Sequence, residues 1–248
     1  MQSVIVGAKE TTYPGWQSTD LRAAGARLDV RRAEDWARSF APDSIDRIVA
    51  EHVLEHMTLA EALAALCNAR RHLKQGGHIR VAVPDAFNPD PVYQEMCRPG
   101  GRGQSWSRLF VYTADEPEHK THYSYRMLAE LMQRAGLRPR LLEWFDERRQ
   151  FHRQAWSVDD GPVKRYFGSP YNLKVFRRWH GYQNLSLIVD GVKETDDGGA
   201  RAEDFCAVEI GSGAARMGRP AVRDSTGEIV VLGGIALFLL LGLRSKQP

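Results

Sequence analysis

The chain has 248 residues, of which 43% are hydrophobic and 26% are charged, and its formal net charge is +3. This length allows one well-buried domain with a tail, and the composition excludes a polytopic membrane protein and a largely disordered chain. Because the net charge is small and the arginines are dispersed, the sequence predicts no nucleic-acid partner.

The predicted elements begin close to the amino terminus. Short apolar runs predict strands over residues 3–6, 16–20 and 27–30, and residues 33–40 predict a short helix. The turn at Asp43–Ser44 then leads into the clearest part of the pattern.

Residues 44–85 predict a strand, an amphipathic helix and a second strand. Thr58 and Glu61 fit a capping box at the helix start, and Gly76–Gly77 predicts the helix end. The strands are marked by the apolar residues Ile45, Ile48, Val49, Ile79, Val81 and Val83, and the helix by an apolar stripe at Leu59, Leu63, Leu66 and Leu73. This order is a βαβ unit, in which the two strands are parallel.

The second half continues the alternation. Asn88 is expected to cap a helix with Pro89 at its first position. Residues 96–119 have little periodicity and many turn residues, which predicts a long loop over the site. The remaining expected elements are a helix over 125–135, a strand over 140–145, a polar and aromatic insert over 146–183, and a last strand over 185–192.

The three cysteines, Cys67, Cys97 and Cys206, are far apart and lack metal-ligand spacing. Their number and spacing predict buried, unreactive thiols in a reducing compartment, without a disulfide framework. The first residues do not resemble a secretory signal, so we expect a cytoplasmic active domain.

The carboxyl-terminal region changes character twice. Residues 196–227 are rich in glycine, alanine and charge, and predict a flexible linker. Residues 228–248 form an apolar tail in which 229–243 carry no charge. As a helix this run would cover roughly 22 Å, short of the ~30 Å of a bilayer core. A membrane anchor at the inner face of the membrane, an interfacial helix and a protein-packing strip remain alternatives.

A polar cluster of Glu51, His52, Glu55 and His56 directly follows the first strand of the βαβ unit. Open parallel sheets gather ligand-binding groups at such strand ends. The pattern His52-x-x-Glu55-His56 also matches that of inverted zinc peptidases, which suggests a zinc-dependent hydrolase as a rival. That chemistry needs the pattern in mid-helix and a third ligand, whereas here it lies between a strand and a helix start. We therefore assign no metal from the sequence.

The loop at Gly7, Ala8 and Lys9 follows the first strand, as a nucleotide-binding loop should, but has one glycine where the full pattern has three. Asp20 ends the second strand, where an acidic side chain can accept hydrogen bonds from ribose hydroxyls or simply form a turn.

Four segments carry a resemblance to a known family: VIVGAKETTYPGWQSTD, FAPDSIDRIVAEHVLEHM, RRHLKQGGHIRVAVPD, and HYSYRMLAELMQRAGLRPRLLEWFDERRQFHRQAW together with NLSLIVDGVK. The chain resembles class I S-adenosylmethionine-dependent methyltransferases, especially a bacterial group of small predicted members, over residues 2 to about 194. The resemblance implies a three-layer, Rossmann-like α/β fold with a mostly parallel sheet in a domain over residues 1–195, and S-adenosylmethionine as cofactor.

The resemblance also implies residue roles. Gly7, Ala8 and Lys9 would pass beneath the methionine moiety, and Asp20 would hold the ribose. The remaining cofactor contacts would be Asp29 and Val30 beside the adenine and Glu51 and His52 beside the methionine and sulfonium. The loop departs from the family's acidic-x-G-x-G-x-G pattern.

A methyl acceptor that is a hydroxyl also needs a base to remove its proton. The candidates are His52, His56, Asp85 and His122, each with a structural alternative. Because no base is unmistakable and the glycine loop is thin, a non-catalytic cofactor-binding or scaffold domain is the rival from another class.

The acceptor is suggested by aromatic residues in a lid drawn from residues 96–123 and 146–183. Such rings stack on sugar or aromatic faces, which favours a small molecule or a glycan, although core packing is the alternative. The rings are Trp106, Tyr112, Trp156, Tyr166, Tyr171 and Trp179.

Overall fold

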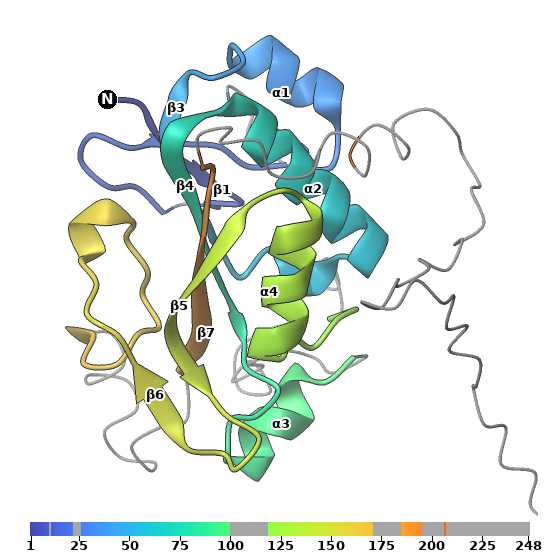
Figure 1. Cartoon of the computed structure of the whole chain (residues 1–248), viewed down its shortest axis with the longest axis vertical. Coiled ribbons are helices and arrows are strands. Elements are labelled where there is room, and N and C mark those ends of the chain that lie inside the picture. Colours follow the sequence, from blue (N-terminus) through green and yellow to red (C-terminus); the bar gives the residue numbers. More distant parts are fainter. Residues whose placement is uncertain (10, 22–25, 100–118, 171–184, 195–205, 207–248) are drawn as a thin grey trace, which may run out of the picture. The chain divides into compact units, whose positions relative to one another are not determined.

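The computed structural model describes residues 1–9, 11–21, 26–99, 119–170, 185–194 and 206. All of them belong to one compact unit, Met1–Gly211. Seven strands form one sheet in the order β2-β1-β3-β4-β7-β5-β6 (Figure 1). The predicted α/β class is confirmed.

The sheet has a parallel and an antiparallel part. β1 pairs in parallel with β2 and β3, and β3 pairs in parallel with β4. β7 is antiparallel to both β4 and β5, and β6 is antiparallel to β5. The strands are β1 (Ser3–Val6), β2 (Gln17–Ser18), β3 (Ile45–Glu51), β4 (Leu73–Pro84), β5 (Arg138–Phe145), β6 (Phe151–Arg153) and β7 (Ser186–Val192).

Helices cover one face of this sheet. Figure 1 shows α2 and α4 side by side on that face, with α1 next to α2. The helices are α1 (Ala33–Ser39), α2 (Leu59–His72), α3 (Pro91–Cys97) and α4 (Tyr125–Arg134), with 3-10 turns η1 (Leu54–His56) and η3 (Val158–Asp160).

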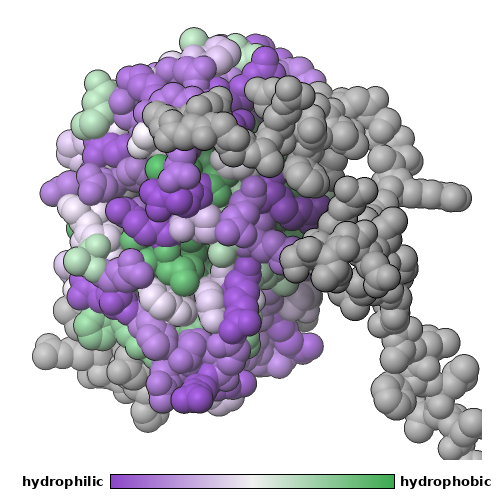
Figure 2. All heavy atoms as spheres, viewed as in Figure 1, coloured by the Kyte–Doolittle hydropathy of each residue, from purple (hydrophilic) through white to green (hydrophobic). Residues whose placement is uncertain are grey.

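The two faces of the sheet have different cores, because successive side chains of a strand point to opposite sides. Val81 and Val83 of β4 and Val189 of β7 pack in the large apolar cluster under the helices. Ala82 and Ile188 point the other way and pack in a smaller cluster covered by the segment that carries Trp156, Val163 and Tyr166. The described surface in Figure 2 is mainly hydrophilic, in keeping with the charged composition.

A buried ion pair lies on the second face. Arg80 of β4 donates from Nε to Asp190 Oδ1 of β7 at 2.8 Å, and both side chains are fully buried. Arg80 also donates to the carbonyls of Ser157 and Gly161 and stacks over the Trp156 ring. The pair therefore ties the covering segment to the sheet.

The predicted start of α2 is confirmed and its predicted end is wrong. Thr58 and Glu61 form the reciprocal capping box. The helix ends at His72, not at Gly76–Gly77, because the buried Leu73 already pairs with Ile45 of β3. Gly77 instead allows close strand contact, since a Cβ there would lie 2.9 Å from the Asp46 carbonyl oxygen. Leu59, expected in the apolar stripe, is exposed.

Other boundaries also differ from expectation. Asp90 Oδ1 accepts a hydrogen bond from the Tyr93 amide and Pro91 begins α3, so the predicted Asn88 cap with Pro89 at the first position is wrong. Residues 27–30 form no strand; Arg27 makes a single bridge to Asp20. β6 lies within the insert, where no strand was expected.

The prediction of no disulfide is wrong. Cys67 of α2 and Cys206 form a disulfide, and Cys97 is a buried free thiol. The two bonded cysteines are 139 residues apart in sequence, and their Cα atoms are 5.7 Å apart. Sequence spacing therefore carried no sign of this pairing, and the cysteines no longer support a reducing compartment.

The linker over 196–227 lies outside the described residues except at 206, and the apolar run 229–243 lies wholly outside them. Among the residues that are described, no helix has the length and apolarity needed to cross a membrane. Membrane attachment and cytoplasmic location stay predictions.

Candidate active site

Polar residues gather at one edge of the parallel part of the sheet. β1, β3 and β4 run in the same direction, with Val6 opposite Ala50 and Glu51 opposite Ala82. Their carboxyl ends therefore reach one edge, as ligand sites in open α/β sheets require. This brings together the loop at Gly7, the Glu51–His52 pair and the start of the chain after β4.

The loop after β1 turns sharply. Gly7 has a φ of 65° and Lys9 a φ of 48°, and a Cβ at Gly7 would lie 2.5 Å from Val53 Cγ2. Both the backbone angle and the close packing thus require glycine. The Lys9 amide donates to Asp20 Oδ2 at 3.0 Å, so the acidic residue after β2 lies directly against this loop.

This arrangement fits the nucleoside part of S-adenosylmethionine. An ionised carboxylate can accept several hydrogen bonds at once, so the contact with Lys9 is compatible with ribose hydroxyls as further donors. Asp20 and Gly7 lie on adjacent loops at the strand ends, where a ribose and the chain attached to it would lie side by side.

We expect Asp20→Ala to weaken cofactor binding by about 1–3 kcal/mol, because hydrogen bonds to a charged acceptor are lost. Isothermal titration with S-adenosylhomocysteine measures this. The matched control is Asp46→Ala, which removes a carboxylate bound to the Gln2 amide and Lys74 at the other end of β3 and should leave affinity unchanged. Equal affinity of Asp20→Ala and wild type would make Asp20 a turn residue.

Asp29 and Val30 both make hydrogen bonds to neighbouring side chains of the protein. The Asp29 carboxylate pairs with Arg31 at 2.7 Å, and the hydrogen bond from that guanidinium lowers the pKa of Asp29. The Val30 carbonyl accepts from Trp36 Nε1 and Asn68 Nδ2. Their predicted place beside the adenine stays a prediction.

Glu51 meets a segment that sequence reasoning assigned only in outline, as part of a lid. Its Oε1 accepts from the amides of Lys164 at 2.7 Å and Arg165 at 3.1 Å. Lys164 Nζ also donates to Thr11 Oγ1 at 2.8 Å. The chain at 164–165 therefore crosses the strand ends beside Glu51. No signal in the sequence could pair residues 113 positions apart.

His52 is engaged through both ring nitrogens. Its Nδ1 lies 2.7 Å from Glu55 Oε1, and its Nε2 lies 3.0 Å from Ser186 Oγ and 3.4 Å from the Arg165 guanidinium. Because arginine only donates, Nε2 accepts and Nδ1 carries the proton. Burial, and then the Arg165 charge, hold the pKa of His52 well below its usual value. The neutral ring is the form a general base needs, and its catalytic role stays a prediction.

The zinc-peptidase pattern does not lie on an α-helix. Residues 54–56 form only the 3-10 turn η1, and His52 precedes it with a φ of 55°. His52 is also hydrogen-bonded to Glu55. The helical pairing of His52 with His56 that the pattern needs is therefore not formed.

Asp85 and His122 lie beyond the end of β4. The buried Asp85 carboxylate accepts from the amides of Phe87 and Phe145, each at 2.8 Å, and burial raises its pKa to about 7. The bond from Phe145 ties the end of β4 to the end of β5. Burial, and then His119, lower the pKa of His122. The predicted roles of Asp85 and His122 as catalytic bases stay predictions.

His56, the remaining base candidate, lies in a cluster with Glu55 and His119. His119 was not named from the sequence, because nothing in its local pattern shows that it reaches the turn after β3. The two histidine ring centroids are 5.0 Å apart.

Of the predicted lid aromatics, Trp156 and Tyr166 pack against each other with centroids 5.2 Å apart. Trp156 also lies under Arg80, so these two rings cover the sheet. The other four, Trp106, Tyr112, Tyr171 and Trp179, lie outside the described residues.

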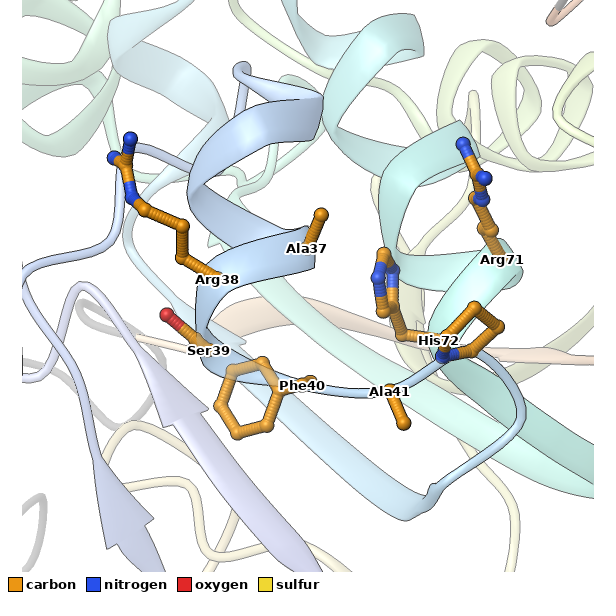
Figure 3. Close-up of a pocket in the computed structure, with 8 residues that line it drawn as sticks. Ala37, Arg38, Ser39, Phe40, Ala41, Arg71 and His72 are labelled. Carbon is orange, nitrogen blue, oxygen red and sulfur yellow. The ribbon is translucent and has the colours of Figure 1, made fainter.

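A surface pocket of about 310 Å³ lies elsewhere (Figure 3). It is lined by Ala37, Phe40, Arg71 and His72, where the ends of α1 and α2 meet. Because Phe40 precedes β3 in the chain, this pocket is near the amino end of that strand. It is separate from the strand ends that carry Asp20 and Glu51.

No curated protein sequence matches. Similar solved structures include S-adenosylmethionine-dependent methyltransferases from Thermotoga maritima (12% identity, TM-score 0.43, covering 78% of this chain and 82% of that one) and Archaeoglobus fulgidus (11%, 0.40, 76% and 83%). A third is the 1,6-didemethyltoxoflavin-N1-methyltransferase of Burkholderia thailandensis (14%, 0.40, 78% and 71%).

The sequence profile of one family, described as a methyltransferase domain, matches residues 14–142. That span is a little over half of the chain and includes Asp20, Glu51, His52 and Asp85. The chain therefore belongs to this methyltransferase-domain family and is an enzyme of that class.

Proposed function

We propose that the domain transfers a methyl group from S-adenosylmethionine to a small-molecule or glycan acceptor. The family match supports methyl transfer. The observation that carries the choice of cofactor is the contact of the Asp20 carboxylate with the Lys9 amide, beside the tight turn at Gly7. It provides an acidic acceptor next to a closely approaching backbone, which a ribose and its attached chain require.

Bound S-adenosylmethionine supplies a methyl group already activated on a sulfonium. The chain has then to orient the two reactants, exclude water and, for a hydroxyl acceptor, take up a proton. Asp20 orients the ribose, and the crossing chain at Lys164 and Arg165 limits access of water to the strand ends. His52, at this edge, is the candidate proton acceptor, and proton uptake at Nε2 requires its contact with Arg165 to open.

The acceptor class rests on chemistry rather than on a described pocket. The net charge of +3 gives no electrostatic reason to choose nucleic acid. Aromatic side chains suit stacking on sugar or aromatic faces, and the lid sequence is rich in them, although Trp156 and Tyr166 pack on the sheet. A small molecule or a glycan is therefore the class to test first.

The experiment is transfer of a labelled methyl group. The full chain is incubated with methyl-tritiated S-adenosylmethionine and a panel of hydroxyl- and amine-bearing small molecules and glycans. We expect label in an acceptor, with a higher cofactor KM for Asp20→Ala and no change for Asp46→Ala.

The rival is a cofactor-binding domain without catalysis. It is favoured by one observation, that the Glu51 carboxylate and both His52 nitrogens already have partners within the protein. If wild type and the variants bind the cofactor but transfer no label to any member of the panel, the result would support this rival over methyl transfer.

A further inference from the structure

Three metal-ligating side chains meet between η1 and the chain that precedes α4. Glu55 and His56 come from η1, and His119 comes from a segment more than 60 residues away. One donor atom from each lies within 4.8 Å of the others. Glu55 is 0% exposed and His119 is 8% exposed, so this is an interior cluster and not a chance grouping of surface charges.

The Glu55 carboxylate has one oxygen without a hydrogen bond. Oε1 accepts from His52 Nδ1 at 2.7 Å, whereas the buried Oε2 accepts no hydrogen bond from any described residue. An unpaired carboxylate oxygen in the interior is costly, and a cation bound to it removes that cost. This oxygen is the observation that points to a ligand.

His119 is oriented as a metal ligand would be. Its Nδ1 lies 3.1 Å from the Cys97 carbonyl oxygen, which only accepts, so Nδ1 carries the proton. Nε2 then carries the lone pair that a metal needs. A ligating histidine almost always donates its other N–H to a carbonyl or a carboxylate in this way.

The turn η1 and the segment that carries His119 are joined by hydrogen bonds that do not use the three metal-ligating side chains. The Glu55 carbonyl accepts from the amides of Lys120 at 2.8 Å and Thr121 at 3.1 Å. Thr121 Oγ1 donates to the Met57 carbonyl at 2.7 Å. The backbone therefore holds His119 beside η1 and preorganises the cluster.

We propose that Glu55, His56 and His119 bind one divalent transition-metal ion, Zn²⁺ by preference. Two imidazoles with one carboxylate suit zinc or iron better than magnesium or calcium, which prefer oxygen ligands alone. Three protein ligands leave a coordination position for water or another molecule. This site goes beyond the proposed methyl transfer, although Glu55 also accepts the hydrogen bond of His52 Nδ1, so its test measures metal binding and not methyl transfer. Its ligand set also differs from the His52 and His56 pair of the peptidase pattern.

The test measures metal binding by the full chain. After treatment with a chelator and dialysis, the protein is titrated with Zn²⁺ by calorimetry and with Co²⁺ by visible absorption. We expect about one ion per chain, and a rise in melting temperature when Zn²⁺ is added. Glu55→Gln and His119→Gln should each weaken affinity by more than about tenfold, since each removes a ligand.

The matched control is His152→Gln, which breaks another histidine–carboxylate contact, the 2.8 Å pair with Asp146 at a half-exposed site. Among the described residues, no third metal-ligating side chain joins that pair. It should bind the ion as wild type does. Absence of stoichiometric binding by wild type at tens of micromolar Zn²⁺, or equal losses in all three variants, would overturn the site. The wild-type titration decides the question even if a variant fails to fold.

Discussion

Asp190→Asn is expected to lower the free energy of unfolding by about 3–5 kcal/mol, the cost of leaving a buried charge without its partner. Arg80 and Asp190 are both fully buried. Arg80 donates two hydrogen bonds to Asp190, from Nε and from the guanidinium end, and Arg140 donates a third at 2.7 Å. Burial disfavours the charged carboxylate, but the bonds from Arg80 outweigh it and hold the pKa of Asp190 below its usual value. The neutral amide of asparagine keeps the shape of the side chain but has no negative charge to balance the buried Arg80.

Urea unfolding at neutral pH, followed by fluorescence, measures the loss. The control is Glu95→Gln, which breaks the exposed pair with Arg98 and should change stability by less than about 1 kcal/mol. If Asp190→Asn were as stable as Glu95→Gln, the buried pair of Arg80 and Asp190 would not contribute to the stability of the fold.

Cys206→Ser is expected to lower the free energy of unfolding by about 2–5 kcal/mol, because a disulfide that closes a long loop restricts the unfolded chain. The cross-link to Cys67 spans 139 residues, from α2 to the chain beyond β7. Wild type in reductant should be destabilised by a similar amount, while Cys206→Ser should not respond to reductant.

Thiol counting gives an independent check of the bond. Under denaturing, non-reducing conditions, wild type should show one reactive thiol per chain, from Cys97. Three reactive thiols in wild type, together with unfolding that is insensitive to reductant, would show that Cys67 and Cys206 are not joined.

The βαβ unit was predictable because its signals are local. The apolar runs of β3 and β4 and the reciprocal bonds of Thr58 and Glu61 depend on residues close in sequence, and the structure has all of them. The order of α4, β5 and β7 followed from the same kinds of pattern. The predicted boundaries were wrong where a contact with a distant residue sets the end of an element. Helix α2, for example, ends before Leu73 because Leu73 pairs with Ile45 of β3.

The candidate site divides in the same way. Gly7, Asp20, Glu51 and His52 could be placed at one edge, since the carboxyl ends of parallel strands meet there. The partners of Glu51 and His52 could not be predicted, because Arg165 and Ser186 come from chain segments with no local signal for the contact. The sequence therefore predicted that these four residues share one edge of the sheet, but not which side chains contact them.

Cofactor binding at the edge that carries Asp20, on which the proposed methyl transfer rests, is measured by calorimetric titration of the full chain with S-adenosylhomocysteine and S-adenosylmethionine. We expect saturable binding of both at a stoichiometry of about one per chain, weakened by Asp20→Ala and unchanged by Asp46→Ala. Absence of binding at about 1 mM ligand, a concentration that detects interactions as weak as roughly −4 kcal/mol, would contradict it.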